Sequence, residues 1–344
     1  MQLGDIGGWA GVLRRLTSRG ELSRAEAAAA MSDILAGNAT PAQIAGFIVA
    51  LRMKGEATEE LNGLLDAMFE AATLVSLPEG LVVIDVVGSG GDQSHSINVS
   101  TLAALTAVGA GARICKHGNR AASSTSGSAD LLEGFGVALD VSPETVATCV
   151  VEAGIGFCFA PRFHPAMRHA GPARRELGVP TVFNYLGPIA NPARVKRLLL
   201  GVGDATMARP MLDVLAARGA EAAWVVHGDD GMDELTTATT SQVLELRNAE
   251  VHAVQVDPAT FGLAPATRAD LAVQSQAEAL AAARAVLDGA KGRHRDIVVL
   301  NAGAALLVAG IAVTLADGIE RASESLSVGA AAVALTRLVE VSNS

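Results

Sequence analysis

The chain contains few cysteines: Cys115, Cys149 and Cys158 are the only three, and no two of them form a CxxC pair. This number and this spacing argue against a disulfide framework and against a structural zinc site. No stretch reaches the roughly 18 uncharged apolar residues that a membrane-spanning helix needs. Residues 1–20 also lack the apolar core and the cleavage site of a signal peptide. We therefore expect a protein of the reducing cytoplasm that does not bind or cross a membrane.

Basic and aromatic residues are scarce as well. The 344-residue chain has 26 lysines and arginines against 36 aspartates and glutamates, a formal net charge of -10, and only 3% aromatic residues. The acidic balance argues against a surface that binds nucleic acid over the whole protein, although a local basic cleft remains open. The length suffices for one large core, or for a large and a small one. The expected ligand is therefore a small molecule.

The first part of the chain has the start and stop signals of helices. Two capping boxes, Ser23 with Glu26 and Thr40 with Gln43, begin predicted helices. A further helix is expected over residues 58–72, and no strand pattern precedes it. We therefore expect a small all-helical domain over residues 1–72.

From residue 73 onward, short β-branched runs alternate with helical stretches rich in alanine and leucine. The predicted strands include residues 82–87, 224–227 and 297–300. This alternation is typical of βαβ units, and it predicts a larger α/β domain with a mainly parallel sheet over residues 73–344. Prolines and asparagines break up residues 161–192, which we expect to connect the two domains and to line the cleft between them.

Two polar loops follow predicted strands and lead towards helices. Residues 88–92 read Gly-Ser-Gly-Gly-Asp, and residues 116–120 read Lys-His-Gly-Asn-Arg. Free N–H groups and helix dipoles converge at such places, so the sequence predicts two phosphate-binding loops. A glycine-rich loop alone is equally typical of a plain turn between a strand and a helix.

The polar residues behind these loops also have two interpretations. Asn98, Ser100 and Thr101 bind an anion, or they cap the helix that starts there. The donors Lys116, Asn119, Arg120, Ser123 and Ser124 form a second binding cluster, or an ordinary polar loop. Lys116 favours the binding interpretation, because it follows directly on an apolar predicted strand.

Acidic residues gather behind another predicted strand, in the segment 228–234. Asp233 and Glu234 are candidate magnesium ligands, and Asp92 suits a cation or a ligand hydroxyl; the alternative for the acidic segment is a solvent-exposed turn. The histidines lack the spacing of a zinc site, and His227 is expected to be hydrogen-bonded at the rim of the core. No residue is assigned as a general acid or base.

Taken together, these residues resemble the anthranilate phosphoribosyltransferase family nearly end to end. The matching motifs are Ala39–Ile44, Ala50–Gly55, Gly88–Asp92, Lys116–Arg120, His164–Met167, Phe183–Pro188, Val226–Gly228 and Asp233–Glu234. The Lys-His-Gly-Asn-Arg motif is the most specific of them. Two positions depart from the family pattern: Ser89 replaces the usual threonine, and Pro180 stands where an arginine is frequent.

The resemblance implies transfer of a phosphoribosyl group from phosphoribosyl pyrophosphate to the amino nitrogen of anthranilate, in tryptophan biosynthesis. It implies a helical domain completed by part of residues 161–192, a hinge to the α/β domain, a homodimer and Mg²⁺ as cofactor. The phosphoribosyl pyrophosphate site would comprise Gly88, Gly91, Asp92, Ser96, Asn98, Val99, Ser100, Thr101, Lys116, His117, Gly118, Asn119, Arg120, Ala121, Ala122, Ser123, Ser124 and Ser128. Anthranilate would meet Gly88, Asn119 and Arg174, and magnesium would meet Ser100, Asp233 and Glu234.

Two other functions remain as alternatives. A pyrimidine nucleoside phosphorylase has a similar domain layout and phosphate loop, but it lacks the Lys-His-Gly-Asn-Arg and Asp-Glu motifs. A non-catalytic nucleic-acid-binding homologue conflicts with the intact acids Asp92, Asp233 and Glu234 and with the negative net charge.

Overall fold

A seven-stranded sheet forms the centre of the molecule. The computed structural model describes residues 1–121 and 125–344, and its strand order is β3-β2-β1-β4-β5-β6-β7. The strands are β1 (Ile84–Gly88), β2 (Ile114–Gly118), β3 (Ile155–Phe159), β4 (Arg197–Gly201), β5 (Ala222–Gly228), β6 (Ser241–Arg247) and β7 (Glu250–Val256). The first five are parallel, and β6 and β7 extend the sheet as an antiparallel hairpin. The α/β fold with a mainly parallel sheet is therefore confirmed.

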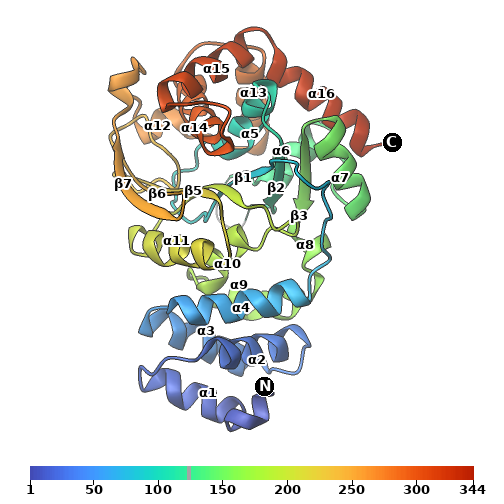
Figure 1. Ribbon diagram of the computed structural model, residues 1–344, viewed down its shortest axis with the longest axis vertical. Helices are drawn as coiled ribbons and strands as arrows, with labels where there is room; N and C mark the ends of the chain where they lie inside the picture. Colours follow the sequence, from blue (N-terminus) through green and yellow to red (C-terminus); the bar gives the residue numbers. More distant parts are fainter. Residues whose placement is uncertain (122–124) are drawn as a thin grey trace.

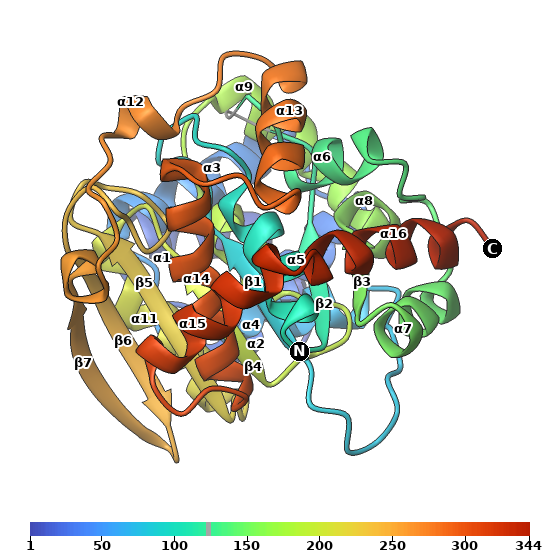
Figure 2. The same ribbon diagram turned by 90° about the horizontal axis from the view of Figure 1, so that it is seen from above.

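Helices cover both faces of this sheet (Figures 1 and 2). One face packs against α5 (Val99–Gly109), α13 (Gln276–Leu287), α14 (Arg293–Ala309), α15 (Leu315–Ser327) and α16 (Ala330–Ser342). The other face packs against α10 (Val182–Ile189) and α11 (Ala208–Ala217). In β4, Leu199 faces the first layer while Leu198 and Leu200 face the second, as the twofold periodicity of a strand requires.

The N-terminal helices form a bundle beneath the second layer (Figure 1). They are α1 (Gly8–Thr17), α2 (Arg24–Leu35), α3 (Pro41–Lys54) and α4 (Thr58–Glu70). Both predicted capping boxes are present, since Ser23 and Thr40 accept hydrogen bonds from the N–H groups of Glu26 and Gln43. The bundle shares one hydrophobic core with α10, α11 and the lower face of the sheet.

The remaining helices are short or peripheral. They are α6 (Ser128–Gly134), α7 (Pro143–Glu152), α8 (Ala160–Phe163), α9 (Gly171–Leu177) and α12 (Arg268–Leu271). The segment 161–192 thus consists of short helices, and α9 and α10 pack on helices of the bundle. Among the described helices no single one is long and apolar enough to cross a bilayer; α15 and α16 reach that length only as a pair bent by 68°.

One predicted strand is wrong. Residues 297–300 belong to α14, a helix that is buried from Ile297 to Ala309. A helix buried on every side carries a continuous apolar run, so its periodicity resembles that of a buried strand. Strands β3, β4, β6 and β7 were not predicted.

Candidate active site

The predicted loops meet at one edge of the sheet because the strands before them are parallel. The carboxyl ends of β1, β2, β4 and β5 are all glycines, and Gly88 of β1 lies beside Gly201 of β4. Strand β1 has β2 on one side and β4 on the other, so the chain connections leave it in opposite directions. Ligands of open α/β sheets bind at such a switch point, outside the carboxyl ends of the strands.

The glycine loop packs directly against the acidic segment. Asp233 Oδ2 accepts a hydrogen bond of 2.6 Å from the N–H of Gly90. A Cβ atom at Gly88 would overlap the Asp233 carboxylate, so a larger residue would displace this side chain. Gly91 has a φ of +82°, a left-handed conformation that favours glycine. Ser89, which replaces the usual threonine, keeps the side-chain hydroxyl. Its Oγ accepts a hydrogen bond from the N–H of Gly203.

Three acids lie together at this edge. Burial and, to a smaller extent, the neighbouring Asp92 raise the pKa of Asp233 to about 7. Burial and the charge of Asp233 raise the pKa of Glu234 well above its usual range, although Lys116 and the N–H of Ser100 oppose this. Buried carboxylates that repel one another are stabilised by a cation.

The donor set fits Mg²⁺. Carboxylate and hydroxyl oxygens are the ligands that this ion prefers. The described residues offer no ready cage of three or more acidic, histidine or cysteine ligands. This also suits Mg²⁺, because it retains several water molecules and binds substrate phosphates rather than filling an all-protein site.

The N-terminus of α5 presents polar atoms without partners. Asn98 is the N-cap residue, but its side chain does not cap the helix; Nδ2 donates to the carbonyl of Ser126 at 2.9 Å. Within the described part of the chain, Asn98 Oδ1 and Thr101 Oγ1 are buried and have no hydrogen-bond partner. The capping interpretation is therefore wrong for Asn98, and the free N–H groups of this helix end suit an anion.

Lys116 on β2 is almost fully buried. Its Nζ donates to the carbonyl of Val86 and, at 3.2 Å, to Oγ of Ser100. Burial lowers the pKa of Lys116, and the surrounding acids oppose this shift. The lysine thus lies between the two loops rather than on the surface.

The rest of the second loop faces other directions. Arg120 pairs with Asp130 at 3.0 Å and Glu133 at 2.7 Å on α6. His117 turns away from the loop, and its Nδ1 lies 3.0 Å from the carbonyl of Gly187. Ser128 Oγ donates to the carbonyl of Asn119, and the N–H of Ala121 donates to Asp130.

The side chain of Val99 is buried in the core. Gly118 ends β2, and Ser96 forms an isolated bridge to Ala272. Ala122, Ser123 and Ser124 lie outside the described residues.

Arg174 lies on α9 in the connecting segment. Its guanidinium stacks on the ring of Phe183 at 5.0 Å, and burial lowers its pKa. Among the described residues, the guanidinium makes no hydrogen bond and no ion pair. It therefore presents free donors to an anion.

Sequence reasoning missed two residues of this site. Arg268 on α12 donates to the carbonyls of Asp92 at 2.6 Å and Asp230 at 3.0 Å, and so ties the glycine loop to the acidic segment. No local sequence pattern indicates this role of Arg268, since 176 residues separate it from Asp92. Asp85 on β1 is fully buried, and its position inside an apolar strand was an available signal.

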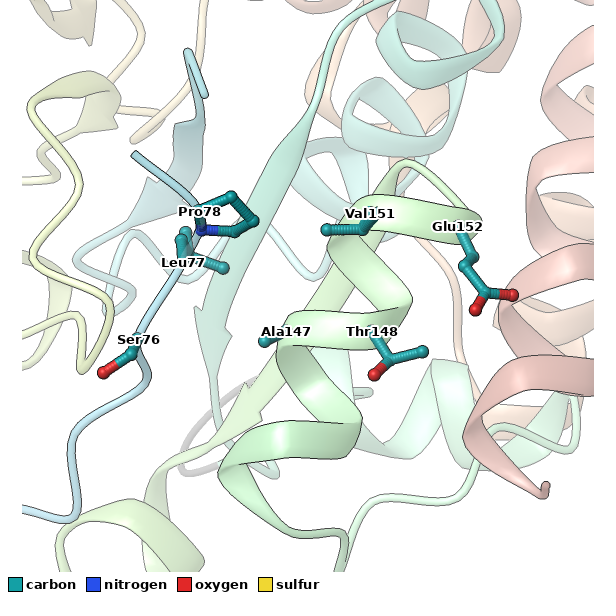
Figure 3. Close-up of a pocket in the computed structure, with 7 residues that line it drawn as sticks. All are labelled: Ser76, Leu77, Pro78, Ala147, Thr148, Val151 and Glu152. Atoms are coloured by element: carbon teal, nitrogen blue, oxygen red, sulfur yellow. The ribbon is translucent and has the colours of Figure 1, made fainter. Parts of the chain in front are cut away.

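A cavity of about 370 Å³ lies elsewhere, between residues 76–78 and α7 (Figure 3). Its only charged lining residue is Glu152, which already pairs with Arg337. None of the predicted site residues lines it, so it is separate from the candidate site.

His227 on β5 is hydrogen-bonded as predicted: its Nδ1 lies 2.8 Å from the carbonyl of Val202.

Comparisons with known proteins agree with this geometry. The model of the glycosyl transferase family α/β domain matches residues 80–332, and that of the family's helical bundle domain matches residues 10–72. Anthranilate phosphoribosyltransferase of Salinispora arenicola is 50% identical over 342 residues, covering 97% of both chains. That of Nocardioides sp. is 51% identical over 336 residues, covering 96% of this chain and 98% of its own.

Solved structures give the same result. Anthranilate phosphoribosyltransferase from Thermus thermophilus has a TM-score of 0.90 and 41% identity, covering 97% of this chain and 99% of its own. The enzyme from Saccharomyces cerevisiae in complex with phosphoribosyl pyrophosphate and Mg has a TM-score of 0.89 and 28% identity, covering 97% and 98%. The chain therefore belongs to the anthranilate phosphoribosyltransferase family of glycosyl transferases.

Proposed function

We propose that the loops at the carboxyl edge of the sheet bind phosphoribosyl pyrophosphate while Arg174 receives anthranilate. The chain is a pentosyltransferase of tryptophan biosynthesis, and it joins the phosphoribosyl group to the amino nitrogen of anthranilate. The observation that carries the assignment of the site is the meeting of the glycine loop, the α5 N-terminus, Lys116 and the acidic segment at the switch point. The yeast relative with bound phosphoribosyl pyrophosphate supports the assignment.

The reaction separates charge. The bond from the anomeric carbon to pyrophosphate breaks while a bond from the amino nitrogen forms, and the nitrogen then loses a proton. The α5 N-terminus and Lys116 would stabilise the negative charge that develops on the leaving group. An aromatic amine attacks without prior deprotonation, so catalysis rests on positioning and electrostatics, and no residue needs to serve as a strong general base.

We propose Ser100, Asp233 and Glu234 as the residues that hold Mg²⁺, with Asp92 beside them. Their crowding supports this, because Asp92 and Asp233 raise the pKa values of their neighbours. When bound, the ion would neutralise negative charge on the pyrophosphate group. Arg268 would keep the Asp92 carboxylate near the acidic segment by holding both backbones.

We propose that Arg174 pairs with the carboxylate of anthranilate, near Gly88 and Asn119. A planar guanidinium with free donors suits bidentate recognition of a carboxylate. Stacking on Phe183 would fix the plane of the guanidinium. The yeast relative in complex with 4-fluoroanthranilate supports a binding site for the aromatic acid on this fold.

Other parts of the resemblance stay proposals. We propose a division at residues 72 and 73, completion of the helical domain by part of residues 161–192, a homodimer and a cytoplasmic location. The shared core of the bundle with α10 supports the second of these. The nucleoside phosphorylase and nucleic-acid alternatives are set aside, because curated relatives at about half identity carry the transferase activity over nearly the full length.

The test is the loss of anthranilate fluorescence when the purified protein meets phosphoribosyl pyrophosphate and Mg²⁺, with a chelator control. Loss that depends on the metal supports the substrates and the cofactor together. No loss with folded protein would reject the assignment, and phosphorolysis of thymidine or uridine would be tested next.

A further inference from the structure

Strands β1 and β2 are paired over a much shorter stretch than their neighbours. Their parallel register contains one Cα pair, Ile84 with Ile114, whereas β1 with β4 and β2 with β3 each continue to the ends of the strands. The N–H of Ile84 donates to the carbonyl of Arg113 at 3.0 Å, which belongs to this single regular site. The two strands therefore separate towards their carboxyl ends, where both loops begin.

Side chains take over the backbone groups that this separation leaves unpaired. A regular parallel ladder continuing from Ile84 and Ile114 would join the N–H of Val86 to the carbonyl of Cys115, and the N–H of His117 to the carbonyl of Val86. Instead, Asn191 Nδ2 donates to the carbonyl of Cys115 at 2.7 Å, and Lys116 Nζ donates to the carbonyl of Val86. The N–H of His117 donates to both carboxylate oxygens of Asp85 at 3.3 Å.

Asp85 is central to this replacement. It is fully buried, and its Oδ2 also accepts a hydrogen bond of 2.7 Å from Asn191 Nδ2. A buried carboxylate is costly unless it is paired and hydrogen-bonded, and here Asn191, the N–H of His117 and the charge of Lys116 supply these interactions. The residue therefore connects β1, β2 and the end of the segment 161–192.

We propose that Asp85 is a positioning residue for the transfer: with Asn191 it replaces the missing ladder and sets the distance between the glycine loop and the loop that begins at Lys116. The inference rests on the proposed function, in which both loops contribute to binding phosphoribosyl pyrophosphate. Asp85 itself does not touch the substrate in this assignment. It acts through Lys116 and the backbone of His117.

The test compares Asp85→Asn with a matched control. The amide keeps the size of the side chain but loses its charge and one of its two acceptor oxygens. We expect the KM for phosphoribosyl pyrophosphate to rise about tenfold or more, as for loss of a hydrogen bond to a charged group, while the KM for anthranilate changes less than about twofold. Ser325→Ala removes a different buried bond, from Ser325 Oγ to the carbonyl of Thr106, and should leave both KM values unchanged.

Hydrogen exchange tests the positioning without any substrate. In Asp85→Asn, the amides of residues 86–90 and 115–118 should exchange faster, while the pairing of β4 with β5 keeps its protection. Asn191→Ser, which keeps the charge of Asp85 but withdraws both amide donations, should produce the same local change. This second variant decides the question if Asp85→Asn fails to fold.

The outcomes separate this inference from the proposed function. Unchanged exchange at the two strand ends in both folded variants, or an unchanged KM for phosphoribosyl pyrophosphate in an active variant, would overturn the role of Asp85. A wild-type protein that transfers nothing would reject the proposed function. Exchange alone would then decide the structural role of Asp85, with local acceleration supporting it and no change rejecting it.

Discussion

At the scale of single residues, Arg174 gives the most direct test of substrate assignment. Its guanidinium is stacked on Phe183 and has free donors among the described residues. We expect Arg174→Ala to raise the KM for anthranilate by about tenfold or more, because a charge-assisted bidentate pair is lost, with little change in the KM for phosphoribosyl pyrophosphate. Arg174→Lys should raise the KM for anthranilate less than Arg174→Ala does, because lysine keeps the charge but not the bidentate geometry. Steady-state kinetics with each substrate varied gives the answer, and comparable effects on both would reject the assignment.

Two buried histidines predict a pH dependence of stability. Burial, with the neighbouring His164, lowers the pKa of His117 to about 3, and burial also lowers the pKa of His164. In the unfolded chain both rings take up protons below about pH 6.5, whereas in the folded protein the ring of His117 stays neutral down to about pH 3 and that of His164 takes up its proton only at a lower pH than in the unfolded chain. The contribution of the two histidines to the free energy of unfolding should therefore be complete above about pH 6.5 and decrease as the pH falls towards 3.

His117→Asn isolates this effect. The amide retains a donor for the carbonyl of Gly187 and does not titrate. We expect the variant to be less stable overall but to lose less further stability between about pH 7 and about pH 5. Urea unfolding at both pH values measures this. An equal loss in the variant and the wild type would show that other groups cause the acid sensitivity.

Residues differed in how far the sequence could reveal them. Lys116, Asp233 and the glycine loop stand next to strand ends in the sequence, so local pattern was enough to find them. The Asn98 side chain was ambiguous because capping and ligand binding use the same residue types. Arg268 depends on a contact between distant segments, which no local pattern encodes.

At the scale of elements, Glu60 joins three helices of the bundle. It is fully buried on α4 and accepts hydrogen bonds from the N–H of Leu22 before α2, from Lys54 Nζ on α3 and from the N–H of Ala57. Glu60→Ala should lower the free energy of unfolding by about 3–5 kcal/mol, because it leaves a buried ammonium unpaired. Glu60→Gln should cost less, since it keeps an acceptor oxygen.

Glu59 on the same helix provides the control. It is exposed, so Glu59→Ala should change the free energy of unfolding by less than about 0.5 kcal/mol. Urea denaturation followed by circular dichroism compares the variants. Similar losses for Glu59→Ala and Glu60→Ala would mean that the loss of a negative charge in the first turn of α4, rather than the loss of the buried pairing, determines the effect.

The capped helices α2 and α3 were predictable, whereas the buried run at the start of α14 was read as a strand. The capping boxes of α2 and α3 depend on residues three positions apart, so the sequence alone locates them. In α14 the run Ile297–Leu300 is β-branched and apolar, and only its packing against α5 and the sheet makes it helical. Strand β4 was missed because it follows the irregular segment 161–192 with little polar alternation.

At the scale of the whole molecule, substrate and metal should stabilise the α/β part together. Phosphoribosyl pyrophosphate at a hundredfold excess over its Kd should add about 2.7 kcal/mol to the free energy of unfolding when Mg²⁺ is present. A chelator should remove most of this gain, because the three acids would then repel the substrate phosphates. Differential scanning calorimetry measures the stabilisation by phosphoribosyl pyrophosphate. In the double variant Asp233→Asn and Glu234→Gln, this stabilisation should be the same with and without the chelator. A gain that is equally large with chelator in the wild type would remove the metal from the site.

The position of α14 has a consequence for how the protein is made. This helix covers the upper face of the sheet beside α5, β1 and β4, yet it ends only at Ala309. A ribosome releases the chain from its N-terminus, so β1 and α5 emerge long before the helix that buries them. We therefore expect the nascent α/β part to expose apolar surface until α14 has left the ribosome, a state that chaperones for unfinished chains recognise.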